Sequence, residues 1–227
     1  KVISWLEMVR KDAQHIFLMG DVFDFWFEYN KVIPKGFVRL QGKIAEITDS
    51  GVPISFFAGN HDMWVDDYFE KELGMPAYQK PESFSCNDKT FHIGHGDGLG
   101  DGDNAYKFMK KWLFKNKLFH WLFKNILNPN IGIYLAHFWS KSREGKGHYF
   151  DENDFKSPEK EWIWTYCKQM EQKKQHDYYI FGHRHLPLDL KVGKTARYIN
   201  LGEWMHHCTY AVFDGQDLEK KKYEGYS

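Results

Sequence analysis

The sequence predicts an α/β fold. Four short apolar runs, at residues 15–19, 54–58, 90–94 and 177–181, each lead into a glycine and then into polar residues of the kinds that bind metals. Each run is short enough for a strand and apolar enough to be covered on both faces. Segments with helical spacing of apolar residues lie between the runs, and strands that alternate with helices are typical of layered α/β proteins.

The remaining elements follow from apolar spacing and from turn residues. In chain order we expect a helix at 3–9, a helix at 38–47, a short helix at 64–73 that ends at Gly74, a hairpin that turns at Asn87-Asp88, a helix at 162–175, and strands at 196–202 and 209–213.

Polar side chains of metal-binding types follow each of the four runs. The candidate ligands are Asp21, Asn60, His95, His183 and His185, with Asp24, His61 and Asp97 close behind. Imidazole, carboxylate and amide groups without a thiolate suit Mn²⁺, Fe, Zn²⁺ or Mg²⁺. One such motif alone occurs often by chance. Four in series, all after strand-like runs whose carboxyl ends converge on one crevice, indicate a metal site.

The pair His183 and His185 bears on the number of ions. Histidines at i and i+2 cannot readily share one ion, but they can serve two adjacent ions, and a carboxylate such as Asp21 can bridge such a pair. Two neighbouring ions are the usual device for in-line attack on phosphorus.

The motifs together resemble the calcineurin-like metallophosphoesterases. Gly20-Asp21-x-x-Asp24, Gly59-Asn60-His61-Asp62, His95-Gly96-Asp97 and Gly182-His183-x-His185 occur in that family's order. The resemblance implies an α/β/β/α sandwich, two mixed sheets face to face with helices outside, in a single domain over 1–227. In a narrower form, residues 20–26, 95–99 and 182–187 resemble the bacterial UDP-2,3-diacylglucosamine diphosphatases of lipid A synthesis, which implies a helical lid inserted at 103–150.

Roles for single residues come from the same resemblance. Asp21 would bridge two divalent ions, expected to be Mn²⁺, while Asn60, His95 and His183 complete one site and His185 contributes to the other. His61, oriented by Asp24, would neutralise charge on the phosphoryl oxygens or protonate the leaving oxygen. The reaction implied is hydrolysis of the diphosphate of UDP-2,3-diacylglucosamine, an acylated sugar nucleotide, to UMP and 2,3-diacylglucosamine 1-phosphate.

One feature departs from the family pattern. The family begins with a strand that ends in Asp-x-His, and nothing upstream of Asp21 has that pattern. We therefore expect the sequence to be truncated at its amino end. The alternative is a non-catalytic interaction module with an incomplete metal site.

Residues 104–143 differ in composition from the rest of the chain, because they contain no Asp or Glu but many Lys and large apolar residues. A helix that is apolar over most of its circumference is either sandwiched or lies on a membrane surface. We expect a lid that holds acyl chains and rests on anionic lipid, so that the enzyme is cytoplasmic and peripheral at the inner membrane. An ordinary helical hairpin on the core is the alternative, and nucleic-acid binding is not expected.

Two further segments are candidate substrate contacts. Phe25 and Trp26 lie in an aromatic loop that would form either a wall for an apolar part of the substrate or a packing loop. Lys141 and Arg143 lie in a basic, glycine-containing loop that could clamp a diphosphate or simply connect two elements.

The composition excludes several classes of protein. The 31 basic and 31 acidic residues balance, so no global field favours nucleic acid. The three scattered cysteines predict reduced thiols and no disulfide framework. No obligate protein partner is indicated. A soluble phosphodiesterase or nucleotide phosphatase on the same core remains the alternative function.

Overall fold

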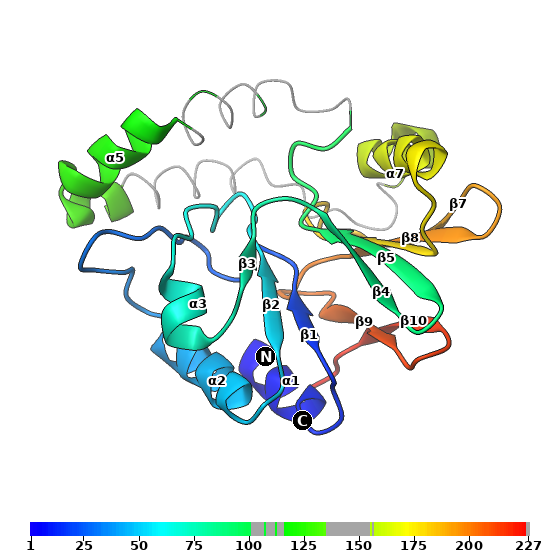
Figure 1. The fold of residues 1–227 in the computed structure, drawn as a ribbon, viewed down its shortest axis with the longest axis horizontal. Helices are drawn as coiled ribbons and strands as arrows, with labels where there is room; N and C mark the ends of the chain where they lie inside the picture. Colours follow the sequence, from blue (N-terminus) through cyan, green and yellow to red (C-terminus); the bar gives the residue numbers. More distant parts are fainter. Residues whose placement is uncertain (101–106, 108–111, 113–115, 135–154, 156, 226–227) are drawn as a thin grey trace. The chain divides into compact units, whose positions relative to one another are not determined.

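The computed structural model describes residues 1–100, 107, 112, 116–134, 155 and 157–225 (Figure 1). The chain forms two compact units. We call residues 14–79 and 102–148 the β1 unit, and residues 1–13, 80–101 and 149–227 the β5 unit. The mixed α/β class is confirmed in both.

The β1 unit contains a parallel sheet in the order β1 (Ile16–Leu18), β2 (Ile54–Phe57) and β3 (Ala77–Tyr78). All three strands run the same way, so this sheet is parallel and not mixed. Helix α2 (Val38–Asp49) confirms the helix predicted at 38–47.

Helix α3 (Tyr68–Leu73) begins four residues later than the sequence predicts. Trp64 instead forms a β-bridge with Phe27. The buried Glu28 carboxylate accepts hydrogen bonds from Asp67 N and Tyr68 N, and it thereby caps the helix from a distant loop. The predicted end is confirmed, because Gly74 closes α3 with a left-handed φ of 60°.

Helix α5 (Lys117–Asn125) and a further helical stretch at 129–134 also belong to the β1 unit. Residues 126–128 separate the two helical stretches. Asn116 caps α5, since its side chain accepts hydrogen bonds from Leu118 N and Phe119 N. Phe123 of this helix lies with its ring 4.8 Å from Phe27 and 4.7 Å from Trp64. Most of the predicted lid, including Lys141 and Arg143, lies outside the described residues.

The β5 unit contains a five-stranded sheet in the order β4-β5-β6-β8-β7 (Figure 1). Its strands are β4 (Glu82–Cys86), β5 (Lys89–Gly94), β6 (Tyr178–Phe181), β7 (Pro187–Val192) and β8 (Ala196–Leu201). β5, β6 and β8 are parallel, and the two edge strands are antiparallel. Strands β9 (Thr209–Phe213) and β10 (Leu218–Lys222) form a separate antiparallel ribbon.

Two strands of this unit, β7 and β10, were not predicted. In β7 the apolar Leu188, Leu190 and Val192 alternate with charged residues, a strand signal that was overlooked. In β10 only Leu218 is buried and charged residues follow it, so the apolar signal is weak. Residues 87–88 turn the β4–β5 hairpin as expected, with Asn87 at a φ of 52°.

Helix α7 (Trp162–Lys173), as predicted, covers the five-stranded sheet after a short 3₁₀ turn, η3 (Pro158–Lys160). Its Ile163 and Cys167 are fully buried against Tyr179, Phe181 and Tyr198. Helix α1 (Val2–Val9) packs Trp5 against Trp204 in the same unit. All three cysteines carry free thiols in the structure.

Candidate metal centre

Two of the four predicted ligand loops leave one edge of the β1-unit sheet. β1 and β2 are parallel neighbours, with Leu18 opposite Phe56, so the segments that follow them emerge side by side. These segments carry Asp21 and Asp24 after β1, and Asn60 and His61 after β2; we call these four residues the first ligand group. His61 N donates to Asp21 Oδ1 at 2.9 Å, so the two loops contact each other directly at a candidate ligand.

Asp62 holds the first ligand group together. Its side chain is fully buried. Oδ1 accepts hydrogen bonds from Gly59 N at 2.7 Å and Asp21 N at 3.1 Å, while Oδ2 accepts from Val22 N at 2.9 Å and Phe23 N at 3.3 Å. One carboxylate therefore satisfies four main-chain donors drawn from both loops. The sequence motif contains Asp62, but its anchoring role was not predicted.

Glycine is required at position 59 by the closeness of the two loops. A Cβ atom there would lie 2.2 Å from Asp21 Oδ1 and 2.6 Å from Asp21 N. Main-chain atoms cannot move aside as a flexible side chain can, so any larger residue would displace Asp21.

His61 contacts Asp24 through the main chain of Asp24. Its Nδ1 lies 2.9 Å from the carbonyl oxygen of Asp24. A carbonyl oxygen only accepts, so Nδ1 carries the proton in this contact and Nε2 is the acceptor nitrogen of the neutral ring. The Asp24 side chain itself is exposed.

The other two ligand loops leave one edge of the β5-unit sheet. β5 and β6 are parallel, with Gly94 opposite Phe181, and Gly182 N donates to the carbonyl oxygen of His95 at 2.9 Å. We call His95, His183 and His185 the second ligand group. The rings of His95 and His183 lie 5.1 Å apart, and the two residues offer nitrogen atoms within 4.8 Å of each other. Two imidazoles this close can reach one ion.

Burial falls along the second ligand group. His95 is 4% exposed, His183 is intermediate and His185 is exposed. Asp97 is buried as well. A mixed donor set that is partly open on one side is typical of a site that takes substrate.

Three of the five predicted ligands have strained backbones. The φ angles of Asp21, His183 and His185 are 52°, 65° and 56°. Left-handed conformations cost non-glycine residues about 1–3 kcal/mol each, and such strain gathers at functional sites. The surrounding contacts must therefore fix these three residues in place.

The predicted substrate contacts differ from each other. Trp26 is 1% exposed, and its ring packs 4.8 Å from both Phe23 and Phe69. This burial favours the packing interpretation for Trp26. Phe25 is only partly buried, with its ring 4.9 Å from that of Phe27.

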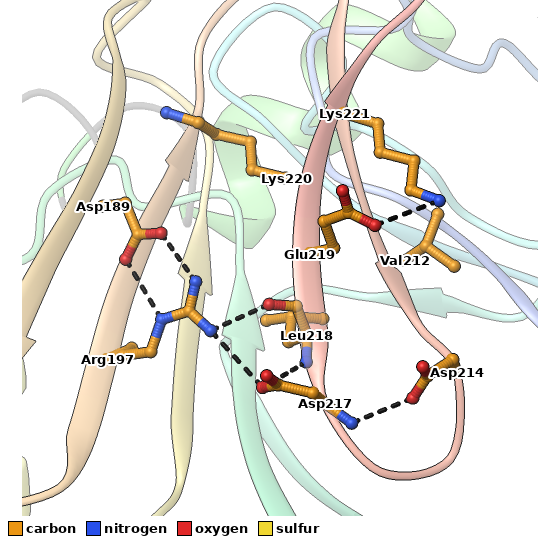
Figure 2. A pocket seen from close by; sticks show the side chains of 9 residues that line it. All are labelled: Asp189, Arg197, Val212, Asp214, Asp217, Leu218, Glu219, Lys220 and Lys221. Carbon is orange, nitrogen blue, oxygen red and sulfur yellow. Dashed lines mark hydrogen bonds and ion pairs between the residues drawn. The ribbon is translucent and has the colours of Figure 1, made fainter.

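A pocket of about 530 Å³ lies elsewhere in the β5 unit, on β7, β8, β9 and β10 (Figure 2). None of the candidate ligands lines it. Its charges pair with one another: Arg197 contacts Asp189 at 2.6 Å, and Lys221 contacts Glu219 at 3.1 Å. The pocket offers no ligand set of the kind found in the two ligand groups.

Comparison with known proteins follows the motifs. The profile of the Calcineurin-like phosphoesterase family matches residues 1–187. A UDP-2,3-diacylglucosamine hydrolase of Porphyromonas gingivalis is 38% identical over 96% of this chain and 87% of that protein. Proteins of the same name from Edwardsiella ictaluri and Ectopseudomonas mendocina are 24% and 25% identical, over 91% and 98% of this chain and 78% and 90% of their own lengths. The chain belongs to the calcineurin-like phosphoesterase family, as its four motifs predicted.

Proposed function

We propose that this chain hydrolyses the diphosphate of UDP-2,3-diacylglucosamine to UMP and 2,3-diacylglucosamine 1-phosphate in lipid A biosynthesis. Family membership makes it a metal-dependent hydrolase. The proposal rests mainly on one observation: in each unit, two neighbouring parallel strands are followed by side chains of the kinds that bind metals. The name of the Porphyromonas gingivalis relative supports the choice of substrate.

In this proposal, the residues of the two ligand groups are the ligands of two divalent ions, with Mn²⁺ expected in the cell. Asp21, Asn60, His95, His183 and His185 would hold the ions, with Asp21 expected to serve both of them, Asn60, His95 and His183 to serve one, and His185 to serve the other. Bound divalent ions supply a hydroxide near neutral pH by lowering the pKa of coordinated water. The oxygen and nitrogen donors of both groups fit Mn²⁺, since neither group contains a thiolate.

His61 is proposed to act on the phosphoryl group. Its Nδ1 is held by the Asp24 carbonyl, which fixes the ring and leaves Nε2 as the nitrogen for chemistry. A protonated Nε2 would neutralise charge on the phosphoryl oxygens or donate to the leaving oxygen.

Helix α5 supports the acyl-chain and membrane part of the proposal. One face packs into the β1 unit through Phe119 and Phe123. Leu118 and Trp121, which lie away from that face, and Ile126, directly after the helix, are 66%, 55% and 66% exposed. A helix with apolar side chains on both faces needs a second apolar partner, and acyl chains or a lipid surface would supply one.

The proposed location is therefore cytoplasmic and peripheral at the inner membrane, beside anionic lipid. Among the described residues, no helix combines the length and apolar character needed to span a bilayer. A Trp121→Ser variant should lose most binding to vesicles that contain anionic lipid. Val38→Ser, which changes a 75% exposed apolar residue on α2, should retain it.

The decisive test incubates the full chain and Mn²⁺ with acylated and with deacylated UDP-glucosamine and measures the UMP released. We expect release from the acylated substrate only. Equal rates on both would favour a soluble phosphodiesterase or nucleotide phosphatase instead. No release from either, with fewer than two ions bound per chain, would favour a non-catalytic module.

A further inference from the structure

Arg184 stands between the two histidines of the Gly182-His183-Arg184-His185 loop, and its side chain is tied to helix α7. Nε donates to Glu161 Oε2 at 2.9 Å. The guanidinium lies over the ring of Trp162, with Cζ 3.9 Å from the ring centroid. The arginine side chain is 15% exposed and the glutamate side chain is 2% exposed, so this ion pair is almost withdrawn from water.

The first turn of α7 is a rigid frame. Glu161 caps the helix, because its side chain accepts a hydrogen bond from Ile163 N. Ile163 is fully buried in the core beneath the sheet. Arg184 is therefore fixed to a part of the molecule that cannot move independently of the sheet.

The same turn also contacts the His95 loop. A Cβ atom at Gly96 would lie 2.8 Å from Ile163 Cδ1, and a Cβ atom at Gly100 would lie 2.3 Å from the carbonyl oxygen of Trp162. Residues 161–163 thus touch both loops of the second ligand group, one through Arg184 and the other through two glycines.

The backbone around Arg184 needs such support. His183 and His185 have φ angles of 65° and 56°, in a region that non-glycine residues leave when nothing holds them there. Arg184 N also donates to the carbonyl oxygen of Gly182 at 2.7 Å, so the residue is held by its main chain as well as by its side chain.

We propose that Arg184, held by Glu161 and Trp162, is a positioning residue that fixes the two histidines of this loop in metal-binding geometry. This inference rests on the proposed function, because it assigns the histidines to the metal ions. A planar guanidinium is suited to the role, since it can pair with a carboxylate and stack on an indole at once. An ammonium group can pair but cannot stack in the same way.

The test measures Mn²⁺ binding to the full chain by isothermal titration calorimetry, with Mn²⁺ retained after dialysis as a second readout. Glu161→Gln removes the charge of the buried carboxylate with little change of shape. Arg184→Lys keeps the positive charge but replaces the planar guanidinium with an ammonium group. Asp189→Asn is the matched control, because it neutralises a carboxylate that pairs with an arginine, Arg197, on the same sheet (Figure 2).

We expect Mn²⁺ affinity to fall at least tenfold in Glu161→Gln and by a smaller factor in Arg184→Lys, with Asp189→Asn within twofold of the parent. Excess Mn²⁺ should restore kcat in both variants, since the ligands themselves are intact. Thermal unfolding in EDTA separates a stability effect from a metal effect.

A purely structural ion pair would give the opposite pattern. If Glu161→Gln lowers the unfolding temperature in EDTA but leaves Mn²⁺ affinity within twofold, the positioning role is wrong. Should Glu161→Gln fail to fold, the Arg184→Lys titration decides alone, and unchanged affinity there overturns the inference. Failure of the parent chain to bind Mn²⁺ would instead overturn the proposed function.

Discussion

The two ligand groups are held by anchors of opposite charge that act on different parts of the chain. In the first group, the buried carboxylate of Asp62 accepts four main-chain hydrogen bonds. In the second group, the Arg184 guanidinium reaches out of the ligand loop to Glu161 and Trp162 on α7. Asp62 holds the main chain of its own two ligand loops, whereas Arg184 ties its loop to two residues outside the motif.

The difference predicts different failures. Loss of Asp62 leaves several buried N–H groups without an acceptor, so the β1 unit should lose stability together with its ligand geometry. A neutral residue at position 161 leaves α7 packed on the sheet through Ile163 and Cys167. The positions of the two histidines in the loop should therefore change more than the free energy of unfolding does.

Asp62→Asn should have the largest effect on stability. An amide nitrogen cannot accept, so two of the four main-chain donors lose their partner whichever way the amide points. At about 1–3 kcal/mol for each orphaned buried group, the free energy of unfolding should fall by about 3 kcal/mol or more in urea denaturation. Asp49→Asn, at an exposed position on α2, is the control and should change little. A loss below about 1 kcal/mol would show that the carboxylate is not the anchor.

Acid should loosen the second group before the first. His92, on β5, lies within hydrogen-bonding distance of Tyr166 Oη at 3.0 Å and Ser83 Oγ at 3.2 Å, and burial lowers its pKa to about 4. The pKa of His176 beside it is lowered too, chiefly by burial. Since the folded pKa is below the unfolded value, stability is fully present above about pH 6.5 and is lost as pH falls toward 4.

The expected loss from His92 is about 3 kcal/mol at most across that window, at 1.36 kcal/mol for each pKa unit. Urea denaturation in EDTA at several pH values measures it, and EDTA removes the contribution of bound metal. His92→Gln should flatten the pH dependence by about one proton in the same window. An unchanged slope in this variant would assign the acid sensitivity to other groups.

Gly96→Ala should cost about 1–3 kcal/mol, because the added Cβ meets Ile163 Cδ1 at 2.8 Å and the φ of 116° is strained for alanine. Gly51→Ala is a matched control: its φ is 91°, but nothing lies within 4 Å of the added Cβ. Denaturation of both variants separates backbone strain from the contact with α7. Equal losses would mean that Ile163 moves aside freely and that the frame at residues 161–163 is softer than proposed.

Asp189→Asn should have the smallest effect, below about 1 kcal/mol in urea denaturation, because exposed ion pairs contribute little. The Asp189–Arg197 pair is also about one third exposed on both sides. If Asp189→Asn lowered the free energy of unfolding as much as Asp62→Asn, the exposure of a carboxylate would not determine how much its contacts stabilise the fold.

The sequence predicted what is local in the chain. The strands before Asp21, Asn60, His95 and His183 are confirmed. Their signal, an apolar run followed by glycine, lies within a few consecutive residues and does not depend on distant contacts. The start of α3 was wrong, since Glu28, which lies 40 positions from Tyr68, sets it. The Glu161–Arg184 pair was missed for the same reason: its partners are 23 positions apart, and no pattern links them. An aromatic loop such as the one around Trp26 can line a binding site or pack in the core, and only the burial of Trp26 shows that it packs.

The spacing of the parallel strands bears on how the nascent chain gains its ligands. His61 and Asp21, which join the loops of the first group, are 40 positions apart, whereas Thr90 and Asp177, which hydrogen-bond where β5 meets β6, are 87 apart. Contacts between distant positions form slowly, and a chain folds from its amino end as the ribosome extends it. The loops of the first group can therefore meet once residues 21–61 have been synthesised, while those of the second group must wait for the 87 further residues that separate Thr90 from Asp177.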